Sequence, residues 1–380
     1  MSSGRSHEKI YVKITNKEEC HNGFQYQPGL NILQEPFQVE GSCVPGGFYY
    51  TDLENIHHFY DYGVWLWIVE IPDDAQVVED PHKTGGRKWR TDKIILSQKY
   101  SLYDVETVKK FNLKITDEYI KLAIHSSDTI INLLQWLIDT KDQTFLQLQY
   151  TTHILDSASR YGYANLLEWW IKSGLPVNCS IYYALCLASI NGHANVLESW
   201  FKSNLPLKYD EYALDKASES GHTNVLDWWF GSGLELKYSK NALDWASKMG
   251  HLDVLDWWVK SGLPLKYSEN ALDWASSNGH INVLEWWVKI GVPLKYSEKA
   301  LDWASCNGHI NVLEWWVKSG LPLKYSENAL MLASKMGHVK VLDWWFKSGL
   351  GLKYSAKSLD YACINDHVGV LDWWLKVIYL

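Results

Sequence analysis

Apolar residues in the second half of the chain come in short blocks with the period of a helix. In one block they are spaced as i, i+1, i+4 and i+5, at Val283, Leu284, Trp287 and Val288. This spacing predicts a helix over residues 281–290 with one buried face. The block before it predicts a shorter helix over residues 269–277, with Leu272 and Ala275 facing inward. The two blocks together predict a helical hairpin.

Polar residues and turn formers separate the two blocks. Ser268 is suited to cap the first helix, because its hydroxyl can accept a hydrogen bond from a free backbone N–H. Asn278 and Gly279 predict the end of that helix, since glycine tolerates the left-handed conformation. Gly291 ends the second helix, and Pro293 prevents the helix from continuing.

The whole pattern recurs along the chain. The dipeptide Gly-His returns every 29 residues, beginning at Gly192, Gly221, Gly250, Gly279, Gly308 and Gly337. Counting looser copies, we identify nine units, of which the first, over residues 116–140, acts as a cap. One hairpin cannot bury its own apolar face, so stacked copies predict a solenoid that is mainly α-helical. We divide the chain into a domain over residues 1–97, a linker and capping repeat over 98–145, and repeats over 146–380.

The positions of the tryptophans indicate how the surface of each hairpin is used. Of 22 tryptophans, 18 lie between Trp169 and Trp374, and most occur as Trp-Trp pairs in the second helix. The second member of each pair, such as Trp287, falls on the apolar face and is expected in the core. The first member is turned about 100° away. We expect it to fill the groove between neighbouring second helices. The alternative is an exposed aromatic stripe for a partner, made of Trp228, Trp257, Trp286, Trp315 and Trp344.

The repeated string A-S-x-x-G-H-x-x-V-L-x-x-W-W-x-x-S-G-L resembles the ankyrin repeat pattern over residues 115–380. The resemblance implies an ankyrin-type solenoid in which the first helices line a concave, partner-binding face. This chain departs from the pattern in its shorter period and in replacing T-P-L-H by N-A-L-D. Aspartates therefore occupy the histidine column, and we expect them to bond the backbone amides of a neighbouring repeat. They are Asp156, Asp215, Asp244, Asp273, Asp302 and Asp360.

Variable positions in nearly identical repeats indicate where recognition could occur. The two residues before each Gly-His vary and stand at the end of the first helix. In the central repeats they are Lys248, Met249, Ser277, Asn278, Cys306, Asn307, Lys335 and Met336. We interpret them as the partner-binding residues of a non-enzymatic scaffold or adaptor that uses the concave face. The alternative is sequence drift on a solvated surface.

Residues 1–97 contain no repeat. Alternating apolar residues predict strands over 9–14, 47–51, 64–71 and 93–96, and residues 52–62 predict a short helix. Pro28, Gly29 and Asn31 predict turns. These elements indicate a small α+β domain. The strings H-N-G-F-Q-Y-x-x-G-L-N, P-G-G-F-Y-Y-T-D and W-x-x-D-K-I-I-L resemble a domain that precedes repeats in proteins of giant viruses of amoebae. The whole chain thus resembles a giant-virus ankyrin-repeat protein, which implies the host cytoplasm, with the virion as the alternative location, and an unidentified protein partner, for example a host protein.

Charge, cysteine spacing and missing motifs narrow the function further. The net charge of -8 offers no basic field for nucleic acid, and no run of eighteen apolar residues predicts a membrane span. None of the six cysteines forms a CxxC pair, which argues against zinc and disulfide frameworks and favours an intracellular location. Histidines in successive repeats are expected about 10 Å apart, too far to share a metal ion. With no catalytic motif present, we expect no enzymatic activity, no cofactor and no metal.

Three further alternatives stay open. First, the strings His21-x-Gly23, Gly29-Leu30 and Gly47-Phe48-Tyr49-Tyr50 resemble the strand layout of ADP-ribosyltransferases. This resemblance would make residues 1–97 an enzyme, with Tyr60 as a second NAD-holding position and the repeats selecting its targets. Second, the chain could be a structural virion component. Third, the last hairpin could mediate self-association, because it is expected to place Leu371, Trp374 and Leu375 on its core side and then adds Val377, Ile378, Tyr379 and Leu380. The alternative is that this tail folds back over the end of the solenoid and acts as its cap.

Overall fold

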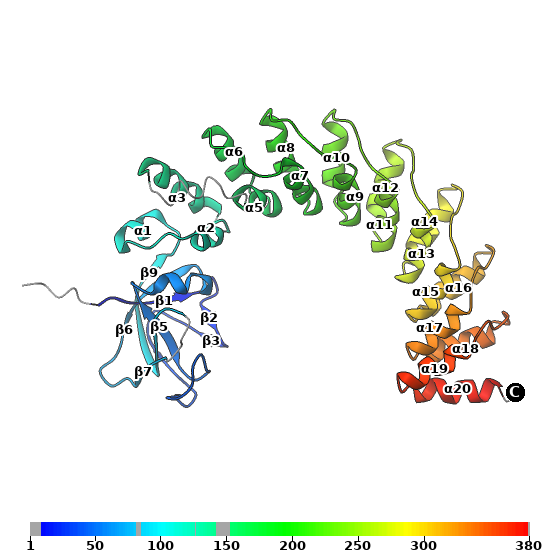
Figure 1. Ribbon diagram of the computed structural model, residues 1–380, viewed down its shortest axis with the longest axis horizontal. Coiled ribbons are helices and arrows are strands. Elements are labelled where there is room, and N and C mark those ends of the chain that lie inside the picture. Colours follow the sequence, from blue (N-terminus) through cyan, green and yellow to red (C-terminus); the bar gives the residue numbers. More distant parts are fainter. Residues whose placement is uncertain (1–8, 81–84, 126, 142–152, 379–380) are drawn as a thin grey trace, which may run out of the picture. The chain divides into compact units, whose positions relative to one another are not determined.

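The computed structural model describes residues 9–80, 85–125, 127–141 and 153–378. The chain forms two compact units. One contains residues 1–158 with 165–179, and the other contains residues 159–164 with 180–380. A β-sheet opens the chain, and within the described residues everything after Ser101 that is regular is helical (Figure 1). The expected order, a small sheet-containing domain before a helical solenoid, is confirmed.

The amino-terminal sheet is antiparallel throughout, and within the described residues it has seven strands. In spatial order these are β4 (Gly29–Ile32), β9 (Lys93–Ser101), β6 (Trp65–Glu70), β1 (Tyr11–Thr15), β5 (Phe48–Asp52), β8 (Lys88–Thr91) and β7 (Val77–Glu79). A separate two-stranded ribbon consists of β2 (Cys20–His21) and β3 (Phe24–Gln25). An aromatic-rich core that includes Tyr26, Phe48 and Trp67 packs against the sheet.

The sequence predicted four of these strands and missed the others. The segment predicted to turn at Gly29 and Asn31 is strand β4. Asn31 uses its side chain to hold the preceding loop, accepting from the N–H of Gln27 at 3.0 Å and donating to its carbonyl at 2.8 Å. A turn-forming residue therefore serves a loop while its own backbone is extended. The helix predicted over residues 52–62 is instead two 3₁₀ turns, Ile56–His58 and Tyr60–Tyr62.

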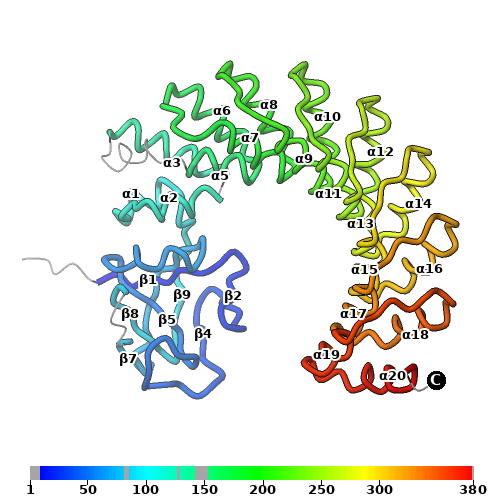
Figure 2. The backbone as a smooth tube through the Cα atoms, turned by 45° about the vertical axis from the view of Figure 1, so that its right-hand side comes forward, coloured from blue at the N-terminus to red at the C-terminus, as the bar shows by residue number. Residues whose placement is uncertain are grey.

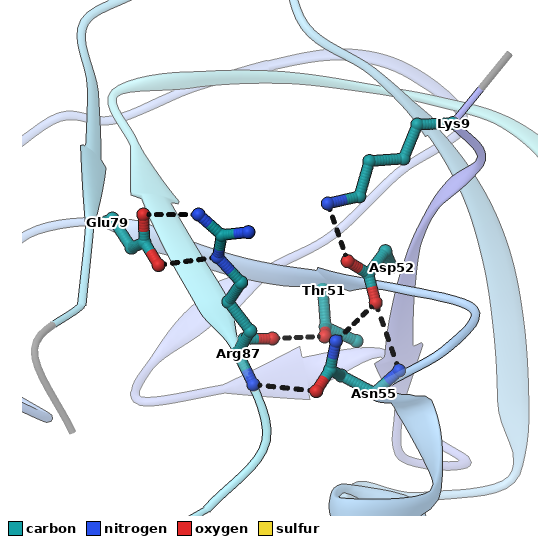
Figure 3. Close-up of polar contacts among 6 residues, drawn as sticks. All are labelled: Lys9, Thr51, Asp52, Asn55, Glu79 and Arg87. Carbon is teal, nitrogen blue, oxygen red and sulfur yellow. Dashed lines mark hydrogen bonds and ion pairs between the residues drawn. The ribbon is translucent and has the colours of Figure 1, made fainter. Parts of the chain in front are cut away.

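A network of polar side chains fixes the end of β5 against its neighbours (Figure 3). Asn55 donates to the Asp52 carboxylate at 2.7 Å and accepts from the Arg87 backbone N–H at 3.0 Å. Thr51 donates to the Arg87 carbonyl at 2.6 Å, and the Arg87 guanidinium binds both oxygens of Glu79 at 2.6 and 3.0 Å. These bonds tie β5 to the turn that follows it and to the start of β8.

Helices begin after the sheet. They are α1 (Val105–Phe111), α2 (Asp117–Ala123) and α3 (Ser127–Asp139). Thr116 caps α2 by accepting from the Tyr119 N–H at 3.1 Å. Helices α2 and α3 pack on each other as a hairpin, which matches the looser first copy of the repeat. Trp136 of α3 is half-buried.

The remaining helices form hairpins whose first and second members alternate along the chain. The first members are α5 (His153–Tyr161), α7 (Ile181–Ile190), α9 (Tyr212–Glu219), α11 (Asn241–Met249), α13 (Asn270–Ser277), α15 (Lys299–Cys306), α17 (Asn328–Lys335) and α19 (Lys357–Ile364). The second members are α6 (Ala164–Lys172), α8 (Ala194–Lys202), α10 (Thr223–Gly231), α12 (Leu252–Lys260), α14 (Ile281–Lys289), α16 (Ile310–Lys318), α18 (Val339–Lys347) and α20 (Val368–Ile378). From α7 onward the first helices pack closely in one row along the inner side of a curve, and the second helices lie outside it (Figures 1 and 2).

The hairpin of α13 and α14 shows how closely the sequence determines one repeat. Both helices lie within a residue of their predicted ends. Ser268 caps α13 by accepting from the Asn270 N–H at 3.3 Å. Val283, Leu284 and Trp287 are fully buried, but Val288, which was predicted to be buried, is 46% exposed. The buried face is turned the other way, towards Trp286, because that side chain packs against the preceding second helix.

Candidate protein-binding surface of the repeats

Aspartates at the start of the first helices clamp each repeat to the next one. Asp273 accepts from the backbone N–H of Ser297 at 2.9 Å and from its hydroxyl at 2.5 Å. The same pair of bonds recurs at Asp215 with Ser239, Asp244 with Ser268 and Asp302 with Ser326. Burial raises the pKa of all four carboxyls, although the bonds to serine act in the opposite direction. The expected role of this column is confirmed for these four residues.

The clamp is interrupted near the end of the solenoid. Met331 occupies the aspartate position of α17, and the hydroxyl of Ser355 in the next repeat is buried without a hydrogen-bond partner among the described residues. In the last repeat Asp360 is exposed. The three hairpins that include α13, α15 and α17 are therefore joined more firmly than the hairpins that include α17 and α19.

The second tryptophan of each pair builds another link between repeats. From α8 onward its side chain is fully buried, and its Nε1 donates at 2.9–3.2 Å to a serine hydroxyl in the first helix of the preceding repeat. Trp287, for example, donates to Ser247 at 3.0 Å and packs on the Tyr267 ring with centroids 4.6 Å apart. The tryptophan thus fills the core and satisfies its one polar atom.

The first tryptophan of each pair fills the groove between second helices. Trp286 is 8% exposed, and the others proposed for an outer stripe, Trp228, Trp257, Trp315 and Trp344, are half-buried. Three of these five donate Nε1 to an acid of the preceding second helix, at 2.8 Å for Trp228 with Glu198, 2.6 Å for Trp257 with Asp227 and 2.7 Å for Trp286 with Asp256. None of the five presents a fully exposed ring. Whether their rims touch a partner stays a prediction.

The Gly-His column joins repeats through a close backbone approach. A Cβ atom on Gly221 would lie 2.9 Å from Cε1 of His251 in the next repeat, and the φ of Gly221 is +81°. Each histidine ring therefore rests on the glycine of its predecessor. His193 and His367 place Nε2 at 2.9 and 3.0 Å from the carbonyls of Arg160 and Lys335. Burial lowers the pKa of His222, His280 and His309, which favours the neutral ring in the folded state.

Among the residues that the structure describes, no group of three histidine, cysteine or acidic side chains is placed to hold a metal ion. Within the same residues, no helix combines the length and the apolar character of a membrane span.

The variable residues lie at the carboxyl ends of the first helices, as predicted. Met249 and Met336 are 47% and 50% exposed. The other members differ in exposure: Asn278, Asn307 and Lys335 are exposed, whereas Lys248, Ser277 and Cys306 are half-buried. The structure therefore places at least one exposed side chain of each central repeat in a row along the inner helices, and two at the end of α17.

Two of these variable residues also have a structural role. The Asn278 amide donates to the Lys248 carbonyl at 2.7 Å, and the Asn307 amide donates to the Ser277 carbonyl at 2.7 Å. The lysine amines lie near aromatic rings of the next repeat, with Lys248 5.8 Å from the Trp274 centroid. Methionine makes no such bond. Met249 and Met336 are thus the members whose exposure is least explained by packing.

In the last hairpin, one of the three residues expected on the core side is exposed. Trp374 is fully buried and Leu371 is half-buried, but Leu375 is 53% exposed, so its predicted inward position is wrong. Leu375 follows Trp374 on the helix and falls on the outer side, as Val288 does in α14. Ile378 is 47% exposed and Val377 is half-buried, while Tyr379 and Leu380 lie outside the described residues.

The residues of the ADP-ribosyltransferase alternative do not all meet at one site. His21, Tyr49 and Tyr50 border a cavity beside β1. Tyr60 does not border it: the side chain is 2% exposed and donates to the Lys114 carbonyl at 3.0 Å. Enzymatic activity of residues 1–97 stays an untested alternative.

Stacked helical hairpins linked by these side-chain ladders define a helical repeat solenoid. A family model described as ankyrin repeats in many copies matches residues 243–286. A protein of Acanthamoeba polyphaga mimivirus named as an ankyrin repeat protein, R868, is 31% identical over 185 residues, covering 48% of this chain and 90% of that protein. The chain belongs to the ankyrin-repeat proteins of this giant-virus type.

Other mimivirus proteins are similar over shorter stretches. Protein R869, which is named as uncharacterized, is 42% identical over 106 residues, or 27% of this chain and 74% of its own length. A further protein named as an ankyrin repeat protein, R229, is 36% identical over 118 residues, or 28% of this chain and 38% of its own length.

Proposed function

We propose that this protein is a non-enzymatic scaffold whose repeats bind a protein partner along the carboxyl ends of the first helices. Ankyrin repeats in general support protein interaction. The observation that carries the finer proposal is the pair Met249 and Met336, exposed at equivalent positions of repeats that are otherwise nearly identical. Methionine offers adaptable apolar contact, and the neighbouring Lys248 and Lys335 add long charged arms.

The partner and place of action are part of the same proposal. The similar proteins come from a virus of amoebae, which supports a host protein as the partner and the host cytoplasm as the location. A structural role in the virion is the alternative. Western blotting of purified particles and of infected-cell cytosol separates the two: strong enrichment in particles would contradict the cytoplasmic proposal.

Replacing the exposed row tests the binding proposal. Candidate partners come from affinity purification out of infected cells, and their affinity is then measured with purified proteins. Changing Lys248, Met249, Lys335 and Met336 to serine is expected to weaken binding at least about tenfold, because interface energy concentrates in a few residues. Circular dichroism and the melting curve should stay unchanged.

A matched control uses the outer side of the same two hairpins. Val259 and Phe346 are 41% and 44% exposed on α12 and α18. Changing both to serine removes a similar amount of exposed apolar surface and should leave the affinity unchanged. If this control loses binding while the fourfold variant keeps it, the second helices carry the site and the proposal is wrong.

A further inference from the structure

The sheet domain contains a cavity that the function of the repeats does not use. It encloses about 420 Å³, a size within the range of small-molecule sites. Strands β1, β2 and β5 contribute to its wall, together with the loop that carries Cys43 and the turn that carries Phe59 and Tyr62. Thr51, which the network of Figure 3 fixes in place, also borders it.

A lysine that has no carboxylate partner among the described residues lies at this cavity. Lys13 of β1 is 5% exposed, and its Nζ donates to the Tyr49 carbonyl at 2.8 Å and lies 4.4 Å from the centroid of the Tyr26 ring. Burial lowers the pKa of Lys13 to about 7. A buried amine of this kind costs stability unless an anion compensates it. Perturbed groups of this type concentrate at functional sites.

A second amine enters the cavity from β8. Nζ of Lys88 donates to Sγ of Cys43 at 3.0 Å and lies 4.9 Å from the centroid of the Tyr49 ring. Burial alone would lower the pKa of Lys88, but the bond to Cys43 and the nearby Asp80 hold it above its usual value. His21 places Nε2 3.1 Å from the Tyr62 carbonyl, and burial lowers its pKa.

The lining is basic and aromatic. Among the described residues that border the cavity, two are lysines, one is a histidine and none is an aspartate or glutamate. The aromatic walls come from Tyr26, Tyr49, Tyr50, Phe59 and Tyr62. Lysine ammonium groups bind carboxylate and phosphate oxygens through charge-assisted hydrogen bonds, and flat rings stack on aromatic side chains.

We propose that this cavity binds a small planar aromatic anion, with its carboxylate or phosphate on Lys13 and Lys88 and its ring among the tyrosines. The site is independent of the protein-binding surface, because its lining comes entirely from β-sheet domain residues 12–88. The bound anion would supply the negative counter-charge that Lys13 lacks among the described residues.

Binding of simple probes to the full chain tests the site. Benzoate and phenyl phosphate represent the two anionic groups, and benzyl alcohol is the neutral analogue. In calorimetric titration, at least one anion should bind one-to-one with a Kd at or below about 1 mM, and benzyl alcohol should bind at least about tenfold more weakly. No saturable binding of either anion at that strength, or equal binding of the alcohol, would overturn the proposal.

Substitutions of the cavity lysines test whether the anion binds within the cavity. Lys13→Met removes the buried charge while keeping most of the side-chain volume, so the fold should tolerate it. The affinity for the bound anion should fall at least about tenfold. Lys93→Met, which removes a lysine paired with Asp74 away from the cavity, should leave the affinity unchanged. Lys88→Met is the second variant, so that misfolding of one leaves the test intact. Undiminished binding in a folded Lys13→Met or Lys88→Met variant would contradict the proposed site.

Discussion

A buried carboxylate at the start of the first helix joins each central repeat to the next. Asp273 satisfies both a backbone N–H and a hydroxyl of Ser297, and its side chain is fully buried. Removing the acid would leave both groups of Ser297 without their acceptor. Leaving a buried polar group unsatisfied costs more than the bond itself contributes.

We therefore expect Asp273→Ala to lower the free energy of unfolding by roughly 1–3 kcal/mol in total, because Ser297 is half-buried and water can replace part of the lost bonding. Asp360→Ala is the matched control, because Asp360 holds the same repeat position but is exposed. Its cost should be clearly smaller. Urea titration followed by helical circular dichroism measures both, and equal losses would contradict the clamp.

At the scale of the helix, the two tryptophans of a pair differ in burial and in the helices that they contact. Trp287 is fully buried in its own hairpin and bonds to α11, the first helix of the preceding repeat. Trp257 is half-buried between second helices and retains contact with water. The second tryptophan therefore belongs to the core of the stack, and the first belongs to the seam between outer helices.

Trp287→Ala should cost roughly 3–5 kcal/mol through the cavity that it leaves. Trp257→Ala should cost less, because the site can take up water and the side chain was only partly buried. The comparison uses the same urea titrations. A larger loss for Trp257 would show that the seam rather than the core holds the solenoid together.

Periodicity made the hairpins predictable and left other features open. The repeated Gly279 and Ser268 positions mark helix ends, so α13 and α14 could be predicted nearly to the residue. The same period could not place Val288, because its exposure depends on how Trp286 packs against a different repeat. The sheet domain offered no repetition. Strand β4 was missed because Asn31 reads as a turn former, although its side chain serves the loop.

The burial of Lys13 at the cavity could not be predicted from the sequence either. In the sequence, Lys13 is one polar position between Val12 and Ile14, which is typical of a solvent-facing strand residue. Only the sheet order, with β1 between β5 and β6, places it beside Tyr49 and Tyr26. The two lysines come from strands far apart in the chain, so no short motif could connect Lys13 with Lys88. The one feature of the sequence that pointed to this cavity was the pair Tyr49 and Tyr50 after Gly47.

At the scale of the whole molecule, the histidine column makes the stability of the solenoid depend on pH. Burial lowers the pKa of His222, His280 and His309 below the unfolded value of about 6.5. The unfolded chain therefore binds more protons than the folded one as the pH falls through 6.5. The contribution of these rings is complete above that pH and is lost below it.

We expect the free energy of unfolding to fall between pH 7.5 and pH 5.5. The raised pKa values of the buried aspartates act in the opposite direction, favouring the folded state as these carboxyls take up protons. A variant with His280→Gln and His309→Gln should show a smaller fall over the same range. An unchanged pH dependence in this variant would contradict a role for the column.

Exposed apolar residues on the last hairpin predict self-association of the chain. Ile364 and Val368 are 73% and 64% exposed, and Leu375 and Ile378 are 53% and 47% exposed. Exposed apolar surface of this kind favours association. The parent should form dimers or larger species at micromolar concentration in light scattering, whereas a variant with Val368→Lys and Ile378→Lys should be monomeric. A monomeric parent would contradict the prediction.

The central claim is that a partner lies along the carboxyl ends of the first helices, and proximity measures this most directly. A photo-reactive amino acid is placed singly at Met249 or Met336, and as controls at Val259 or Phe346 on the second helices of the same hairpins. With a purified partner, crosslinks should form from the two methionine positions and be far weaker from the two controls. Strong crosslinks from Val259 and Phe346, with none from Met249 and Met336, would contradict the account.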